Sequence, residues 1–170
     1  LKNNHYKIIL CSDLYNFNKD PADIRWKKIY NDYFIMRLFL LILNKFKKIQ
    51  PFTILTSGKP IPGFKNEILN YEWLNSSLCF HKSALKDYEF FFNKGKAFYE
   101  DVYTSHAFYI KGYTLKKIKN IKIYHPVTEP MNLKIFYNSL SNQYKIVTKF
   151  SKNKFLFILD AMLFSFIYLF

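Results

Sequence analysis

The chain has 170 residues, of which 50% are hydrophobic and 21% aromatic, and its formal net charge is +14. The length fits one domain or part of a larger one, and the apolar content excludes a disordered polar chain. Only Arg25 and Arg37 are arginines, and lysine supplies point charges suited to anionic lipid rather than the forked contacts of nucleic-acid readers. We therefore expect no nucleic-acid partner, although AT-rich codons alone would also enrich Lys, Asn, Ile, Phe and Tyr.

The first third of the sequence predicts one strand, one helix and a loop. Residues 6–11 form a short β-branched run typical of a strand. Asp20 and Pro21 can open a helix that extends to about Ile49. Its apolar part, residues 33–43, would be ~17 Å long, too short to cross a bilayer. It is either a buried helix or a helix in the membrane interface, and residues 51–63 follow as a turn-rich loop.

The middle of the chain predicts alternating short elements. Gly112 stands where a helix commonly ends, which predicts a helix from Glu100 to about Lys111. A further helix of about twenty residues is expected from Pro130. The remaining expected elements are a strand over 72–80, a short helix or turn over 81–88, an aromatic loop over 90–98, and one or two strands over 115–124.

The last segment, residues 155–170, contains Asp160 as its single charge. Sixteen residues of helix give ~24 Å, short of the ~30 Å hydrocarbon core. The lysines before it are typical of a cytoplasmic flank. We expect the first part of a transmembrane helix here, and the alternative is a terminal core helix.

Two adjacent carboxylates, Glu100 and Asp101, stand out in a chain with few acidic residues. Acidic residues at a helix N-terminus are stabilised by the helix dipole, at ~0.3–1 kcal/mol each. That effect alone would explain the pair. The other interpretation is a proton-accepting position at the edge of a cleft.

An ordered series of motifs surrounds this pair: SGKPIP (57–62), EWL (72–74), Glu100, Asp101, Val102, Ser105, Gly112, Tyr113 and Ile123-Tyr124-His125. Over roughly residues 50–150 this series resembles the C-terminal half of family 2 glycosyltransferases. The resemblance implies an α/β, partial GT-A-like (incomplete Rossmann-like) domain over 1–128, an amphipathic juxtamembrane helix over 129–154 and a truncated transmembrane helix over 155–170.

The resemblance assigns roles to five residues. Asp101 would be the catalytic base of an inverting transfer, and Glu100 would orient it or bind an acceptor hydroxyl. Trp73 and Asn75 would bind the acceptor, a saccharide or a lipid-linked sugar, although a Trp in a strand is also ordinary core. His125 would complete a site for a divalent cation, Mg²⁺ or Mn²⁺, that carries the diphosphate of the nucleotide-sugar donor.

One family feature is missing from the chain, because no two aspartates are separated by a single residue. The donor half and the metal site are therefore expected to be incomplete, and the isolated chain is expected to be inactive. The expected location is the membrane, with the catalytic part on its cytoplasmic side. The alternative function is a non-enzymatic basic protein associated with the membrane.

Overall fold

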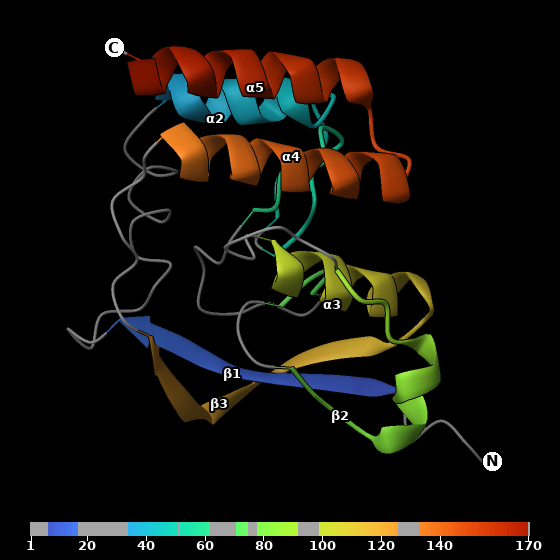
Figure 1. The fold of residues 1–170 in the computed structure, drawn as a ribbon. Helices are drawn as coiled ribbons and strands as arrows, with labels where there is room; N and C mark the ends of the chain where they lie inside the picture. Colours follow the sequence, from blue (N-terminus) through green and yellow to red (C-terminus); the bar gives the residue numbers. More distant parts are fainter. Residues whose placement is uncertain are drawn as a thin grey trace.

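The fold is that of a computed structural model, in which residues 7–16, 34–50, 52–61, 71–74, 78–91, 99–125 and 133–169 are described. The predicted mixed α/β class is confirmed, since these residues form a small sheet with helices on one side of it (Figure 1). The elements in chain order are β1 (Ile8–Asn16), α2 (Phe34–Leu43), β2 (Leu78–Phe80), the 3-10 helix η1 (Lys82–Asp87), α3 (Glu100–Ile110), β3 (Thr114–His125), α4 (Leu133–Lys149) and α5 (Lys154–Leu169).

The sheet has three strands in the order β2-β1-β3, with β1 antiparallel to β2 and parallel to β3. The parallel register shifts between Ser12 and Asp13, which pair with Ile118 and Lys122. β3 thus carries extra residues at a bulge. The one or two strands expected over 115–124 are one bent strand. The strand expected over 72–80 is wrong at its start, because the described residues 72–74 form no strand, whereas Leu78–Phe80 pairs with β1.

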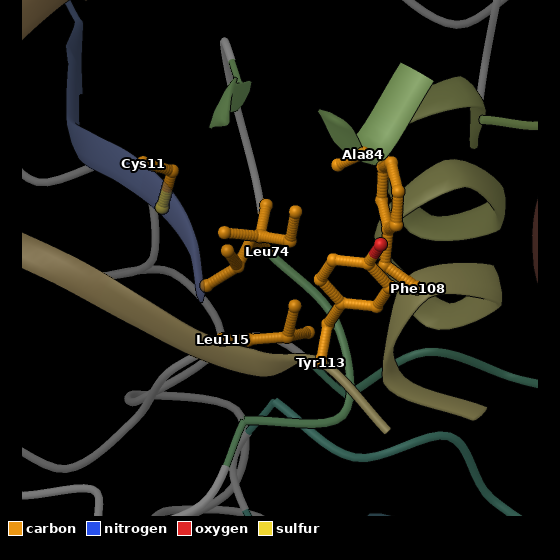
Figure 2. Close-up of a cluster of buried hydrophobic side chains, with 7 residues drawn as sticks. Cys11, Leu74, Ala84, Phe108, Tyr113 and Leu115 are labelled. Atoms are coloured by element: carbon orange, nitrogen blue, oxygen red, sulfur yellow. The ribbon is translucent and has the colours of Figure 1, made fainter. Parts of the chain in front are cut away.

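Helix α3 covers one face of the sheet through a compact hydrophobic cluster. Ile9 and Cys11 alternate along β1 and are both buried, as expected for one face of a strand. In Figure 2 the side chains of Leu74, Phe108 and Leu115 point toward one another from three segments of the chain. This cluster fixes α3 against β1 and β3.

Two further clusters connect α3 to the helices above it. Phe52, Ile54, Trp73, Val102 and Ile146 join the loop at residues 52–61 to α3 and α4. The second cluster joins the same loop to α2 and α5, and consists of Leu40, Leu43, Ile49, Leu55, Ile61 and Leu156. The loop therefore lies at the centre of the molecule, between α3 and the layer formed by α2 and α5 (Figure 1).

Helix α5, expected as the first part of a transmembrane helix, packs along α2 and α4. Among the helices that the described residues form, none is both long enough and apolar enough to span a bilayer. Its one acidic residue, Asp160, is 1% exposed. The inner face of α5 thus carries a charge that needs a partner inside the protein.

The partner of Asp160 is Lys59, from the central loop. Lys59 Nζ lies 2.9 Å from Asp160 Oδ1, and Gln143 Nε2 of α4 donates to Asp160 Oδ2 at 2.8 Å. Burial lowers the pKa of Lys59, and the neighbouring Asp160 carboxylate opposes this shift. The three side chains connect the loop, α4 and α5 in one polar cluster.

Replacing one member of this buried pair should be costly. Lys59→Met leaves the Asp160 carboxylate buried without a cation, and we expect the free energy of unfolding to fall by about 3–5 kcal/mol. Urea unfolding would measure the loss. The double variant Lys59→Met/Asp160→Asn removes both charges and keeps an acceptor for Gln143, so it should be more stable than the single variant. Equal or additive losses would contradict a coupled pair.

A glycine next to Lys59 also marks a close approach of the loop to α4. Gly58 has φ +82°, and a Cβ on it would come well under 3.0 Å from Val147 Cγ2. Gly112, with φ +81°, has nothing within 4 Å of its Cβ position and is the matched control.

We expect Gly58→Ala to destabilise the protein by about 2–4 kcal/mol, from backbone strain plus overpacking, and Gly112→Ala by only about 1 kcal/mol. Thermal unfolding of both variants would measure the difference. Adding Val147→Ala should recover part of the Gly58→Ala loss, and no recovery would exclude the steric contribution.

Candidate active site at the start of helix α3

The two carboxylates open α3, as the sequence predicts. Tyr99 precedes the helix in the left-handed region, with φ 67°, and no side chain caps the helix from that position. Asp101 Oδ1 instead accepts from the backbone N–H of Val102 at 2.8 Å. Asp101 is half-buried, and Glu100 is exposed. The acidic pair therefore stabilises the helix N-terminus and still reaches the molecular surface.

The orientation of α3 places this pair at a particular edge of the sheet. α3 and β3 are joined by a turn at Gly112, and they run in opposite directions (Figure 1). The N-terminus of α3 therefore points in the same direction as the carboxyl ends of the parallel strands β1 and β3. Ligands of open α/β sheets bind outside the carboxyl ends of the strands.

Two side chains of α3 hold the segment at residues 71–74. Ser105 Oγ accepts from Leu74 N–H at 2.9 Å and donates to the carbonyl of Asp101 at 2.5 Å. His106 Nδ1 lies 2.9 Å from the carbonyl oxygen of Glu72. Because a carbonyl only accepts, Nδ1 must carry a proton and donate it. The first turn of α3 and the Trp-containing segment are thus one connected unit.

Trp73, predicted to bind the acceptor, is 5% exposed. Its Nε1–H donates to the carbonyl of Ile61 at 3.2 Å, and its ring lies 5.4 Å from the Phe52 ring, centroid to centroid. The indole is a core side chain in this structure. A sugar ring would contact its face only after neighbouring side chains had moved.

The other two predicted site residues are less completely placed. Asn75 lies outside the described residues. His125 ends β3, where its Cα pairs with that of Asn16. Eleven helical residues rise ~16 Å, whereas a strand of similar length extends about twice as far. β3 therefore continues beyond the level of Glu100, and the metal role of His125 stays a prediction.

A cavity of about 420 Å³ lies between α3, α4 and residues 90–91. Lys145 Nζ lies 4.9 Å from the centroid of the Phe91 ring at its wall. Tyr103 is two residues from Asp101, which is ~200° around a helix. The cavity and Asp101 therefore occupy different sides of α3. The lining residues are Phe90, Phe91, Tyr103, Lys145, Thr148 and Lys149.

Glu89 holds the segment beside this cavity to both helices. Its carboxylate lies 3.0 Å from Lys111 Nζ and 2.7 Å from Lys149 Nζ. These hydrogen-bonded ammonium groups, Lys149 first, lower the pKa of Glu89. Of the aromatic loop expected over 90–98, Phe90 and Phe91 are described, and both line the cavity.

The described residues do not assemble a divalent-cation site. In the part of the chain that the structure describes, no three His, Cys, Asp or Glu side chains gather as a metal would require. Mg²⁺ and Mn²⁺ prefer several oxygen ligands. We derive no catalytic step through a metal from these residues.

Sequence reasoning did not identify the tethering role of His106 or the pairing of Lys59 with Asp160. The position of Asp160 was a usable signal, because a single charge in an otherwise apolar helix requires a buried partner.

Comparisons with protein-family models, with curated proteins and with solved structures found no match for this chain. The function proposed below therefore depends on the residues and their geometry.

The buried imidazole predicts a pH effect on stability. Burial lowers the pKa of His106 to about 4, from 6.5. Because the folded value lies below the unfolded one, the unfolded chain binds a proton first as the pH falls. The stability that neutral His106 contributes is complete above pH 6.5 and is lost as the pH falls toward 4, by about 3 kcal/mol.

Urea unfolding at pH 7.0 and at pH 4.5 would measure this loss. His106→Gln should be less stable at pH 7 and should show a weaker pH dependence than the parent. His81→Gln is the control, because His81 is exposed on η1 and its change should leave the pH dependence intact. An unchanged pH dependence in His106→Gln would refute the assignment.

Proposed function

We propose that this chain forms the acceptor side of an inverting family 2 glycosyltransferase, with Asp101 as the general base. The observation that carries the proposal is the Glu100–Asp101 pair at the N-terminus of α3, which points in the same direction as the carboxyl ends of the parallel strands (Figure 1). The ordered motifs from SGKPIP to His125 support the same assignment. The finer fold assignment, a partial GT-A-like domain, belongs to this proposal.

The proposed reaction is a single displacement at the anomeric carbon of a nucleotide sugar. A hydroxyl of a saccharide or lipid-linked acceptor forms the new C–O bond, while the bond to the nucleoside diphosphate breaks. Asp101 takes the hydroxyl proton, and the diphosphate leaves with the electron pair of the broken bond. General-base assistance of this kind contributes ~10²–10⁴-fold in rate.

The surroundings of Asp101 suit this role. The positive end of the helix dipole favours the ionised carboxylate, which is the form that accepts a proton. Ser105 binds the carbonyl of Asp101 and so holds its backbone to the neighbouring segment. Glu100 is exposed beside it and can orient an acceptor hydroxyl.

The donor side is not assigned to the described residues. Binding a nucleoside diphosphate requires cations or a metal near the leaving group, and we place neither here. We therefore expect the 170-residue chain by itself to transfer little or no sugar. On this proposal, transfer requires a donor half that the described residues do not supply.

The decisive variant is Asp101→Asn, assayed in a protein that joins this sequence to a donor half. It keeps the size and the hydrogen bond to Val102 N–H but cannot accept a proton, so kcat should fall by about 10²–10⁴-fold. The measurement is release of nucleoside diphosphate from a panel of nucleotide sugars, with saccharide and lipid-linked acceptors.

Glu100→Gln is the matched control at the same helix turn, and it should reduce kcat less than Asp101→Asn. Circular dichroism and thermal unfolding would establish that both variants fold. Turnover within twofold of the parent for Asp101→Asn would refute the proposal. It would favour the non-enzymatic alternative, in which this carboxylate only stabilises a helix end.

A further inference from the structure

Helices α2 and α5 present large apolar side chains to solvent. Phe34 and Ile35 of α2 are 75% and 82% exposed, and Phe155 and Met162 of α5 are 67% and 65% exposed. Scattered single apolar residues are ordinary on a protein surface, whereas a contiguous group indicates an interaction site. We define the α2/α5 face by Phe34, Ile35, Leu38, Ile42, Phe155, Ile158 and Met162.

The spacing of these residues makes a continuous stripe on each helix. Residues 34, 38 and 42 follow an i, i+4, i+8 pattern, and residues 155, 158 and 162 follow i, i+3, i+7. The opposite sides are occupied, since Leu40 and Leu43 of α2 pack with Leu156 of α5 in the core. Both helices lie at the end of the molecule farthest from the sheet (Figure 1).

A cluster of lysines lies at one end of this face. The end of α2 and the start of α5 are brought together by Thr56, whose carbonyl accepts from Asn153 N–H at 2.8 Å and whose N–H donates to Asn44 Oδ1 at 3.2 Å. Exposed lysines flank this junction at positions 45, 47, 48 and 154. Lys152, just before α5, is close enough to Lys47 for the two charges to interact. Burial lowers the pKa of Lys152, Glu72 opposes this shift, and Lys47 adds to it.

We propose that the α2/α5 face binds the surface of a membrane that contains anionic lipid, with both helices lying in the plane of the interface. The apolar stripes would enter the boundary between headgroups and acyl chains, as amphipathic helices do. The lysine cluster would remain at the headgroups, where each cation near an anionic surface adds to the affinity. The proposal does not depend on the transfer reaction.

Charge decides between this partner and a second copy of the chain. Each copy carries a net charge of +14, so joining two copies through this face would bring two strongly cationic molecules together. A self-association would have to overcome that repulsion. An anionic bilayer instead supplies both the apolar phase and the opposite charge.

Vesicle flotation of the 170-residue chain tests the proposal, with phosphatidylcholine vesicles and with vesicles containing 30% phosphatidylglycerol as a chosen composition. We expect binding to the anionic vesicles that weakens as salt is added. Lys45→Gln/Lys47→Gln/Lys48→Gln should lower that binding about tenfold to a hundredfold. Lys82→Gln/Lys86→Gln/Lys116→Gln, at exposed positions on η1 and β3, is the matched control and should have a much smaller effect.

The apolar component is tested by Ile35→Gln/Ile158→Gln/Met162→Gln, which should lower binding at least tenfold while circular dichroism stays unchanged. Leu85→Gln/Ile110→Gln alters residues that are 61% and 57% exposed near the sheet, and it should bind like the parent. The variant Lys45→Gln/Lys47→Gln/Lys48→Gln leaves the apolar stripes intact. If the apolar variant fails to fold, this lysine variant alone still tests whether the α2/α5 face binds the vesicles.

Several results would overturn the proposal. Absence of vesicle binding, or equal binding to neutral and anionic vesicles, would exclude an anionic membrane as the partner. Vesicle binding that none of the α2/α5 substitutions reduces would place the contact elsewhere in the chain. A dimer detected by light scattering that the apolar variant abolishes, without vesicle binding, would identify a second copy as the occupant.

Discussion

The buried pair of Lys59 and Asp160 is the interaction on which the arrangement of the helices depends. It joins the central loop to α5, and Gln143 adds α4 to the same cluster. A buried ion pair gives little net stability over an apolar replacement, but it is costly to leave half-made. We therefore infer that the pair favours this alignment of α5 against the loop over others. Once the loop is fixed, the carbonyl of Ile61 is in place to accept from Trp73.

Residues 71–74 connect the loop at residues 52–61 to the candidate site on α3. Their backbone groups bond outside the sheet: Glu72 N–H donates to the carbonyl of Phe52 at 2.9 Å, and Leu74 N–H donates to Ser105. Buried backbone groups need partners, and here the loop and α3 supply them in place of a neighbouring strand. The acidic pair can stabilise the helix end and still be available for a functional role. Asp101 satisfies a backbone donor of α3 and remains half-exposed.

Features that depend on neighbouring residues could be predicted from the sequence, and features that depend on distant partners could not. The α3 boundaries follow from the acidic first turn and from Gly112. The β-branched run predicts the first part of β1, but not its extension beyond residue 11 to Asn16. The strand over 72–80 was predicted too long, because composition does not reveal that Ser105 and His106 would bind its first half. The role of Asp160 depends on Lys59, which is 101 positions away. The orientation of Trp73 was likewise set by packing, and a strand pattern alone does not distinguish a core indole from one that contacts a ligand.

The two proposals constrain each other if both hold. With the α2/α5 face on the lipid, α4 and then α3 follow at increasing distance, and the sheet is farthest from the bilayer (Figure 1). Asp101, at the start of α3, would then stand away from the membrane surface, on the far side of α4 and the loop at residues 52–61. A sugar joined directly to a membrane anchor would not reach that position. In this orientation the geometry favours an acceptor that extends away from the bilayer, such as the free end of a saccharide chain, over the first sugar on a lipid.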